Sequence, residues 1–268
     1  PQVNVFAFIM CMMEAALSIF SASAAGKGAY AARIALDSIE IRNKHRTDRI
    51  RPTSVSLHTD SAATRAEAAS GDLSLTFSTP QSADSLIAAL TRSARALAGQ
   101  IDAQSIDMEQ LKPALPDFAL RVSAGPDNIL NSLLKSRKIA FDALNAEGAN
   151  CDSLPVSIRL RTEGLAYGNV VLDTVTADIR QNGKRLEYAL GLANAPGNLD
   201  NIARAGLYGH LVRNTGQANL YQRNRAGREG FRFGLDVTWT DSLVRASVTP
   251  PDPLFGFCLL YTSPSPRD

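Results

Sequence analysis

The sequence predicts a mainly β protein with a small helical insertion, and three observations indicate this fold class. Apolar and polar residues alternate along many short stretches of the chain, which is the period of strands with one apolar and one solvated face. Turn residues separate these stretches, and Asn182-Gly183 between two alternating runs is the clearest hairpin signal. Only one long segment has apolar residues at helical spacing, and it lies between two groups of strands.

The apolar members of the four clearest alternating stretches are expected to lie on one face of the sheet. They are Phe118, Leu120, Val122, Val156, Ile158, Leu160, Leu186, Tyr188, Leu190, Leu192, Phe231, Phe233, Leu235, Val237 and Trp239. Arg232, Asp236 and Thr238 alternate with the last five and are expected on the opposite face, which fixes the direction of that strand. Shorter alternating stretches run through residues 55–57, 73–77 and 244–248.

The helical insertion is predicted over residues 82–115, between β segments at 1–81 and 116–257. Its first helix is expected to lay a stripe against the apolar face, with Arg92 and Arg95 in water; the stripe consists of Leu86, Ile87, Leu90, Leu97 and Ile101. A second short helix is expected at about 107–114. A third is expected near 127–138, with Asp127 as its N-cap.

Both ends of the sequence are atypical. The apolar N-terminal run, which reaches about residue 25, predicts a strand, with a secretory signal or a frame artefact as the other interpretations. Residues 258–268, "CLLYTSPSPRD", match one reading frame of an adapter used to prepare sequencing libraries. We therefore expect this tail not to be natural, and the remaining residues to be an internal fragment of a longer protein.

No residue pattern in the sequence indicates catalysis, a cofactor or a metal. The formal net charge is only +2, with no basic stripe, which argues against nucleic acid as a partner. His45, His58 and His210 are scattered, and Cys11 and Cys151 have no metal-ligand spacing. We therefore predict that the protein is not an enzyme.

The arginine run at residues 223–228 can be interpreted in two ways. It contains Arg223, Arg225 and Arg228 around Ala226-Gly227, a composition typical of a solvated hairpin tip. Contact with anionic lipid headgroups is the alternative interpretation, because basic clusters favour such headgroups.

The repeated apolar face must be covered by something, and the alternation alone leaves two possibilities open. The first is a purely structural β-sandwich, or a sheet covered by the long helix. The second is a long curved sheet whose concave face is an open apolar trough. Packed cores are much the commoner outcome, so the residue pattern by itself favours the first.

Four motifs in order along the chain favour the second possibility through a family resemblance. They are L-K-P-x-L-P-x-F at 111–118, L-D-T-V at 172–175, L-x-Y-x-L-x-x-A-N-x-P-x-N at 186–198 and G-F-R-F-G at 230–234. Over about residues 36–257 the chain resembles the TamB-like members of the AsmA-like superfamily. These are the translocation and assembly module proteins of Gram-negative envelopes.

The resemblance implies a long, curved antiparallel sheet that forms an open apolar groove. It implies a periplasmic location, with an inner-membrane anchor in a part that this fragment lacks. The implied function is carriage of phospholipid acyl chains between the inner and outer membranes. The alternative is assembly of outer-membrane proteins by strand templating, with an outer-membrane β-barrel assembly protein as partner. The family contributes no catalytic residues.

Overall fold

The computed structural model describes residues 13–24, 29–42, 47–195, 202–240, 243–249 and 254–255. The strands are β1 (Met13–Ala24), β2 (Tyr30–Arg42), β3 (Thr47–Ile50), β4 (Thr53–Thr59), β5 (Thr64–Ser70), β6 (Leu73–Thr79), β7 (Phe118–Ala124), β8 (Ile139–Ala140), β9 (Ala143–Cys151), β10 (Leu154–Tyr167), β11 (Val170–Asn182), β12 (Arg185–Asn194), β13 (Arg204–Val212), β14 (Thr215–Arg223), β15 (Glu229–Thr240), β16 (Leu243–Val248) and β17 (Leu254–Phe255). The helices are α2 (Ala83–Asp102), α3 (Met108–Leu111), the 3-10 helix η1 (Lys112–Ala114) and α4 (Ile129–Lys135).

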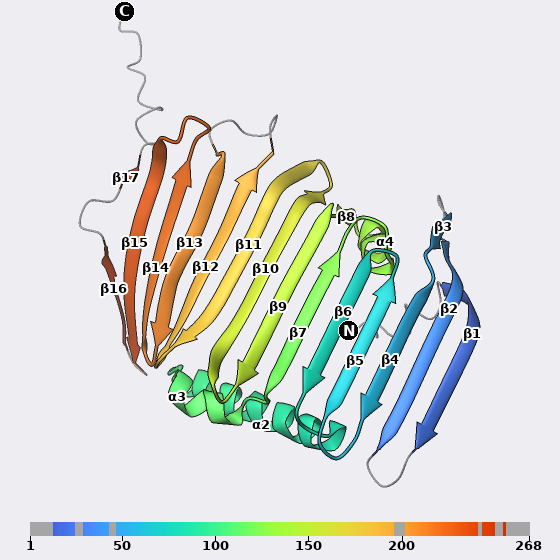
Figure 1. The fold of residues 1–268 in the computed structure, drawn as a ribbon. Helices are drawn as coiled ribbons and strands as arrows, with labels where there is room; N and C mark the ends of the chain where they lie inside the picture. Colours follow the sequence, from blue (N-terminus) through green and yellow to red (C-terminus); the bar gives the residue numbers. More distant parts are fainter. Residues whose placement is uncertain are drawn as a thin grey trace, which may run out of the picture.

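All seventeen strands in the described residues belong to one sheet, which Figure 1 shows as a single layer. Fourteen of them pair antiparallel in the order β1-β2-β4-β5-β6-β7-β9-β10-β11-β12-β13-β14-β15-β16. The short strands β3, β8 and β17 pair with β2, β10 and β15. The sheet is open, with β1 and β16 at its edges, so the predicted mainly β antiparallel fold is confirmed.

The two hairpin turns predicted at Asn182-Gly183 and Ala226-Gly227 are present in the structure. Gly183 has φ 58° between β11 and β12, and Gly227 has φ 76° between β14 and β15. Backbone with positive φ is strained for most residues but not for glycine, so these positions allow tight reversals. The tail at 258–268 lies outside the described residues.

The predicted insertion is confirmed as helical, and it lies along one end of the strands (Figure 1). We call this the α2 end, and the other end of the strands the far end. The Ala83 amide donates to Thr59 Oγ1 at 3.0 Å, beside the β4–β5 turn. Further along, Ile106 pairs with Arg213 at the β13–β14 turn, and Trp239 Nε1 on β15 donates to the Gln104 carbonyl. The chain therefore runs along the sheet from β5 to β15 before it returns to β7.

The prediction that the leucine stripe of α2 lies on the apolar face is wrong. Exposure is 62% for Ile87, 52% for Leu90 and 59% for Ile101, and Leu97 is exposed as well. Ala89 and Ser93 are the buried residues of the helix, and Ser93 Oγ donates to the Ala114 carbonyl at 2.6 Å. Because α2 lies across strand ends beside the returning chain, the helix buries its narrow face of small residues.

Two further predictions concern the exposure of the α2 arginines, which is confirmed, and the N-cap of α4, which is wrong. Arg92 and Arg95 are exposed, as expected. The predicted N-cap Asp127 is wrong, because α4 starts after Asn128, whose side chain accepts a hydrogen bond from the Asn131 amide at 2.9 Å. Asp127 instead pairs with Arg51 at 2.8 Å. An amide side chain suits the cap because Asn128 can also donate, at 2.6 Å, to Asp72.

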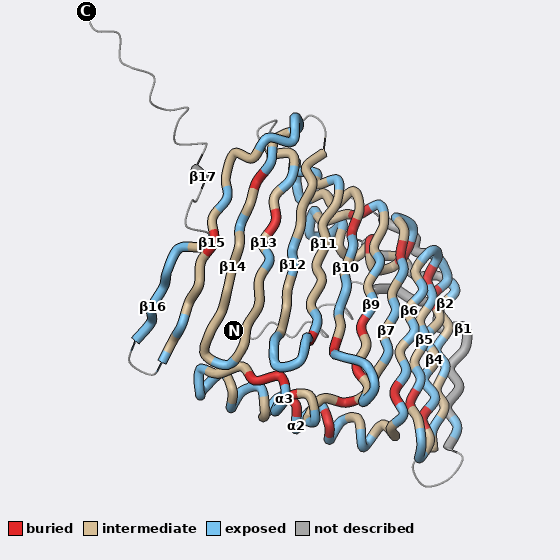
Figure 2. Tube along the Cα trace, turned by 60° about the vertical axis from the view of Figure 1, so that its left-hand side comes forward, coloured by how far each residue is buried: buried red, intermediate tan, exposed pale blue. Residues whose placement is uncertain are grey.

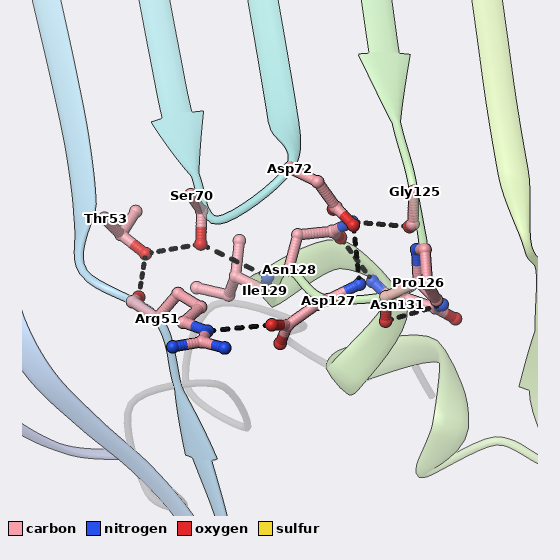
Figure 3. A network of polar contacts seen from close by, with 10 residues as sticks. All are labelled: Arg51, Thr53, Ser70, Asp72, Gly125, Pro126, Asp127, Asn128, Ile129 and Asn131. Carbon is pink, nitrogen blue, oxygen red and sulfur yellow. Dashed lines mark hydrogen bonds and ion pairs between the residues drawn. The ribbon is translucent and has the colours of Figure 1, made fainter.

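A polar network at the far end connects α4 to β4, β5 and β7 (Figure 3). Ser70 Oγ accepts hydrogen bonds from Thr53 Oγ1 at 2.8 Å and from the Ile129 amide at 3.3 Å. Asp72 accepts from the Asn128 side chain and from the Asp127 amide. Burial by itself raises the pKa of Asp72, but these hydrogen bonds outweigh it and hold the pKa below its ordinary value.

We expect Asp72→Asn to lower the free energy of unfolding by about 1 kcal/mol at neutral pH, allowing for solvent screening of this exposed group. The folded-state pKa is below the ordinary value of 3.8, so the stabilisation is complete above pH 3.8 and disappears as the pH falls through the folded-state pKa. Urea denaturation at several pH values measures this. Glu67→Gln, which alters an exposed strand carboxylate, is the control. An equal Asp72→Asn deficit at neutral pH and at pH values below the folded-state pKa would contradict the expectation.

Candidate functional site

The pairing registers bring apolar residues from twelve strands into one continuous row. From β2 to β15 the row consists of Ile34, Val55, Ala68, Leu75, Val122, Ala146, Leu160, Ala177, Leu190, Leu207, Leu220 and Phe233. Directly paired residues of antiparallel strands lie on the same face of the sheet. Every strand in this span therefore contributes an apolar side chain at the same level.

A second apolar row lies beside the first, two residues along each strand toward the α2 end. It consists of Ala32, Leu57, Ala66, Phe77, Leu120, Gly148, Ile158, Ile179, Tyr188, Gly209, Ala218 and Leu235. Its single polar side-chain atom is the Tyr188 hydroxyl, which donates to the Gln217 carbonyl at 2.8 Å. Burial raises the pKa of Tyr188, so the hydroxyl remains a proton donor. We call the two rows the apolar rows, and the face that carries them the apolar face.

The apolar rows are long and narrow. Neighbouring strands lie about 4.8 Å apart, so the eleven steps from β2 to β15 span about 53 Å. Alternate residues of a strand are about 6.8 Å apart, which sets the separation of the two rows. The flanking rows are mixed in β4 and β5, where Thr53 pairs with Ser70 and Thr59 with Thr64. The apolar rows are therefore the part of the face without polar interruption.

All fifteen predicted residues lie on the apolar face. Val122, Leu160, Leu190 and Phe233 belong to the first row, and Leu120, Ile158, Tyr188 and Leu235 to the second. Phe118, Val156, Leu186, Val237 and Trp239 lie nearer the α2 end, and Leu192 and Phe231 nearer the far end. The register thus places four separately predicted stretches on one surface.

Sequence reasoning missed about half of the apolar rows. Ala66 and Ala68 on β5 gave a weak signal, because alanine is common on both faces of a sheet. In β13 the alternation of apolar and polar residues is hard to recognise, because glycine stands at Gly209 where the neighbouring Leu207 predicts an apolar side chain. Only the strand register, which pairs these residues with apolar residues of neighbouring strands, identifies them. The sequence of a single strand does not contain that information.

The side chains of the apolar rows range from half-buried to exposed in the described structure. Exposure is 45% for Ile158, 42% for Leu190 and 43% for Val55. Apart from Gly148, which has no side chain, no member of either row is buried. In Figure 2 the intermediate and exposed colours predominate along the strands. The described strands form one layer, so no second described sheet covers this face.

The margins of the apolar face, in contrast, are covered by the helical segments. At the α2 end, Met108 and Leu111 pack on Val156, which is only 8% exposed. Ile158 follows two residues later on the same face and is 45% exposed. At the far end, the α4 segment contacts the face where the Ile129 amide meets Ser70. Helical segments therefore border an uncovered middle.

The opposite face of the sheet is polar and carries exposed ion pairs between neighbouring strands. Arg121 pairs with Glu147 at 3.2 Å, and Arg180 with Glu187 at 2.9 Å. Hydrogen bonds from the Asn182 and Arg180 side chains hold the pKa of Glu187 below its ordinary value. Exposed pairs of this kind stabilise a fold little, so we interpret this face as the solvated side.

Three further findings concern function. In the parts of the chain that the structure describes, no three His, Cys, Asp or Glu residues are grouped as metal ligands. The described helices include none with the length and apolar character needed to cross a bilayer. In comparisons with known proteins, no protein-family model, curated protein or solved structure matches this chain.

Proposed function

We propose that the apolar face carries phospholipid acyl chains, as a segment of an envelope-biogenesis protein that moves phospholipid between inner and outer membranes. The observation that supports this most is the pair of uninterrupted apolar rows, which crosses twelve strands and is exposed to solvent. Soluble monomers rarely expose a contiguous apolar surface of more than a few hundred Å², and larger patches mark interaction sites. An elongated apolar strip matches the shape of an extended hydrocarbon chain.

The physical basis of carriage is water exclusion. Covering apolar surface is favourable by about 25 cal/mol per Å² and requires no directional bond. Since successive strands present similar side chains, a chain on the strip would have similar free energy at neighbouring positions. Such a surface holds a lipid and still lets it slide.

The proposed setting follows from the family resemblance of the sequence. In this setting the segment works in the periplasm, is anchored to the inner membrane through another part of the protein, and acts without catalysis. Acyl chains bind through surface alone, so the proposed function needs no cofactor, metal or nucleophile.

A second candidate function is the assembly of outer-membrane proteins. The edge strand β16 supports it, because all six of its residues are exposed and Val244 reaches 67%. An exposed edge can receive a further strand from a client protein. In this function the partner is an outer-membrane β-barrel assembly protein or its client.

Photo-crosslinking from β15 in cells tests the lipid proposal. A photoreactive amino acid at Phe233, in the first apolar row, should capture phospholipid. The same amino acid at the neighbouring Arg232, on the opposite face, should not. Equal capture from both positions, or none from either, would contradict lipid carriage. Capture of a protein from Val244 would instead support the assembly function.

A further inference from the structure

Four cavities on the polar face of the sheet, opposite the apolar rows, adjoin one another across the strands. In order from β2 to β14 their volumes are about 330, 370, 490 and 340 Å³. Thr76 lines both the first and the second cavity, Glu147 both the second and the third, and Asp178 both the third and the fourth. Because neighbouring cavities share lining residues, we treat them as one depression and call it the polar groove.

The strand register gives the polar groove one axis, which runs across the strands. Direct pairing leads in nine steps from Arg33 on β2, through one residue of each strand, to Tyr208 on β13. Every residue on this path lines one of the four cavities. Each is also the sequence neighbour of a residue in the first apolar row, as Ala189 is of Leu190, so the path lies on the opposite face. Steps of about 4.8 Å make the axis about 43 Å long.

The polar groove is close to electrically neutral, because its arginines face carboxylates. Arg33 and Glu67 contribute one charge of each sign to the first cavity. The other arginines of the lining form ion pairs, which are Arg121 with Glu147 at 3.2 Å, Arg159 with Asp178 at 3.5 Å, Arg161 with Glu163 at 2.9 Å and Arg180 with Glu187 at 2.9 Å. The polar groove therefore favours a ligand without net charge.

Hydroxyl and amide side chains stand between these charges. Ser56 and Thr76 lie on the axis itself, and Asn145 and Gln217 line the third and fourth cavities. A carboxylate in an ion pair keeps lone pairs that accept hydrogen bonds, and a guanidinium keeps N–H groups that donate them. The polar groove thus presents donors and acceptors along its length, which suits a ligand rich in hydroxyl groups.

An exposed aromatic ring stands at the β13 end of the axis. Tyr208 is 50% exposed and pairs with the small Ala189, and both line the fourth cavity. The Tyr221 ring lies beside it, with 6.3 Å between the ring centroids. Glycine at Gly206 makes room for that neighbour, because a Cβ there would collide with the Tyr221 ring. Tyr208 therefore offers a flat apolar surface, on which the C–H face of a sugar ring can stack.

We propose that the polar groove binds a neutral, extended glycan of the β-1,4-linked type, with one sugar ring stacked on Tyr208. An extended ribbon fits because the axis crosses ten strands without leaving its row of paired residues. A glycan is favoured over a polypeptide because peptide recognition uses a free strand edge or apolar side-chain pockets, whereas this lining is charged, hydroxylic and small. The inference goes beyond lipid carriage and does not depend on it, since the two surfaces lie on opposite faces.

Calorimetric titration of the full 268-residue chain with defined oligosaccharides tests the proposal. The probes are cellohexaose and chitohexaose, which are extended, and maltohexaose, which curls. At least one extended hexasaccharide should bind, and maltohexaose should bind about tenfold more weakly or not at all. Tyr208→Ala should weaken the binding of the extended hexasaccharide by about fivefold, whereas Tyr208→Phe, which keeps the ring, should change it by less than about twofold.

Two arginine substitutions one residue apart provide a matched control. Ala189→Arg fills the fourth cavity beside Tyr208 and should weaken hexasaccharide binding about tenfold. Leu190→Arg places the same side chain on the apolar face and should leave hexasaccharide binding unchanged. An equal loss in both variants would mean that the loss comes from a damaged fold, and would overturn the assignment to the polar face.

The length of the glycan tests whether the cavities act as one groove. The matching disaccharide covers little more than one cavity, so it should bind about tenfold more weakly than the hexasaccharide. Equal affinity for the two would confine binding to a single cavity and overturn the extended groove. No binding of either extended hexasaccharide would overturn the proposal altogether. Binding of an unfolded polypeptide, such as reduced and carboxymethylated lactalbumin, in place of a glycan would also overturn it.

Discussion

Replacing Leu190 with arginine should reduce bound phospholipid at least tenfold while the fold remains intact. Leu190 lies in the first apolar row between Ala177 and Leu207 and is 42% exposed. Its replacement can direct the guanidinium into water, so the free energy of unfolding should change by less than about 1 kcal/mol. An acyl chain over that position would have to desolvate the charge, which costs several kcal/mol. Each 1.4 kcal/mol is about a tenfold loss of affinity.

The matched control is Ala189→Arg, which introduces the same charge one residue away on the polar face. It pairs across the sheet with Asp178 and Tyr208, so its guanidinium enters solvated surroundings. Lipid bound per chain and the thermal unfolding midpoint should both stay near wild type. Unfolding of Leu190→Arg alone would mean that a further layer covers the apolar face, as in a packed sandwich. Equal lipid binding by both variants would contradict carriage on this face.

Asn131→Leu is expected to cause the largest loss of stability, about 3–5 kcal/mol. The Asn131 side chain is completely buried and donates to the Phe141 carbonyl at 2.8 Å and to the Pro126 carbonyl at 3.1 Å. It also accepts from the Phe141 amide at 3.3 Å. Leucine has similar volume but leaves these three backbone groups without partners, and each costs about 1–3 kcal/mol when buried.

Urea denaturation of the full chain measures this loss, with Asn145→Leu as the control. Asn145 lies exposed on the polar face of β9, where the same substitution should change the free energy of unfolding by no more than about 0.5 kcal/mol. A similar small effect at Asn131 would show that α4 contributes little to the fold. Retained lipid binding in both folded variants would separate this structural role from the apolar rows.

The strands could be predicted from the sequence because their information is local. The alternation from Phe231 to Trp239 by itself specifies which side chains share a face, and the register then aligns Phe233 with Leu220. What could not be predicted is the part that depends on distant partners. Ala68 belongs to an apolar row only because it pairs with Val55 and Leu75, and nothing in the sequence of β5 states this.

The position of α2 shows the limit of pattern reasoning more sharply. The hydrophobic stripe was expected to be the buried one, since burial of large side chains normally dominates helix packing. The helix instead lies against the strand ends and against η1, where Ala89 and Ser93 are buried and Ser93 bonds to the Ala114 carbonyl. A helix sequence specifies which faces are apolar, whereas the shape of the surface it meets decides which face is buried.

The meander of the sheet has a consequence for how the molecule folds. Nearly every strand pairs with its neighbour in the chain, so the sheet can grow one hairpin at a time, as a repeat array does. The segment that contains α2 does not follow this local pattern, because Gln104 contacts Trp239, which lies 135 positions away in the sequence. Contacts of such separation form late, since a long loop must close first. The hairpins should therefore form before the segment from α2 to η1 packs on the strand ends. That last step should make the strands, which form separately, unfold as one cooperative unit.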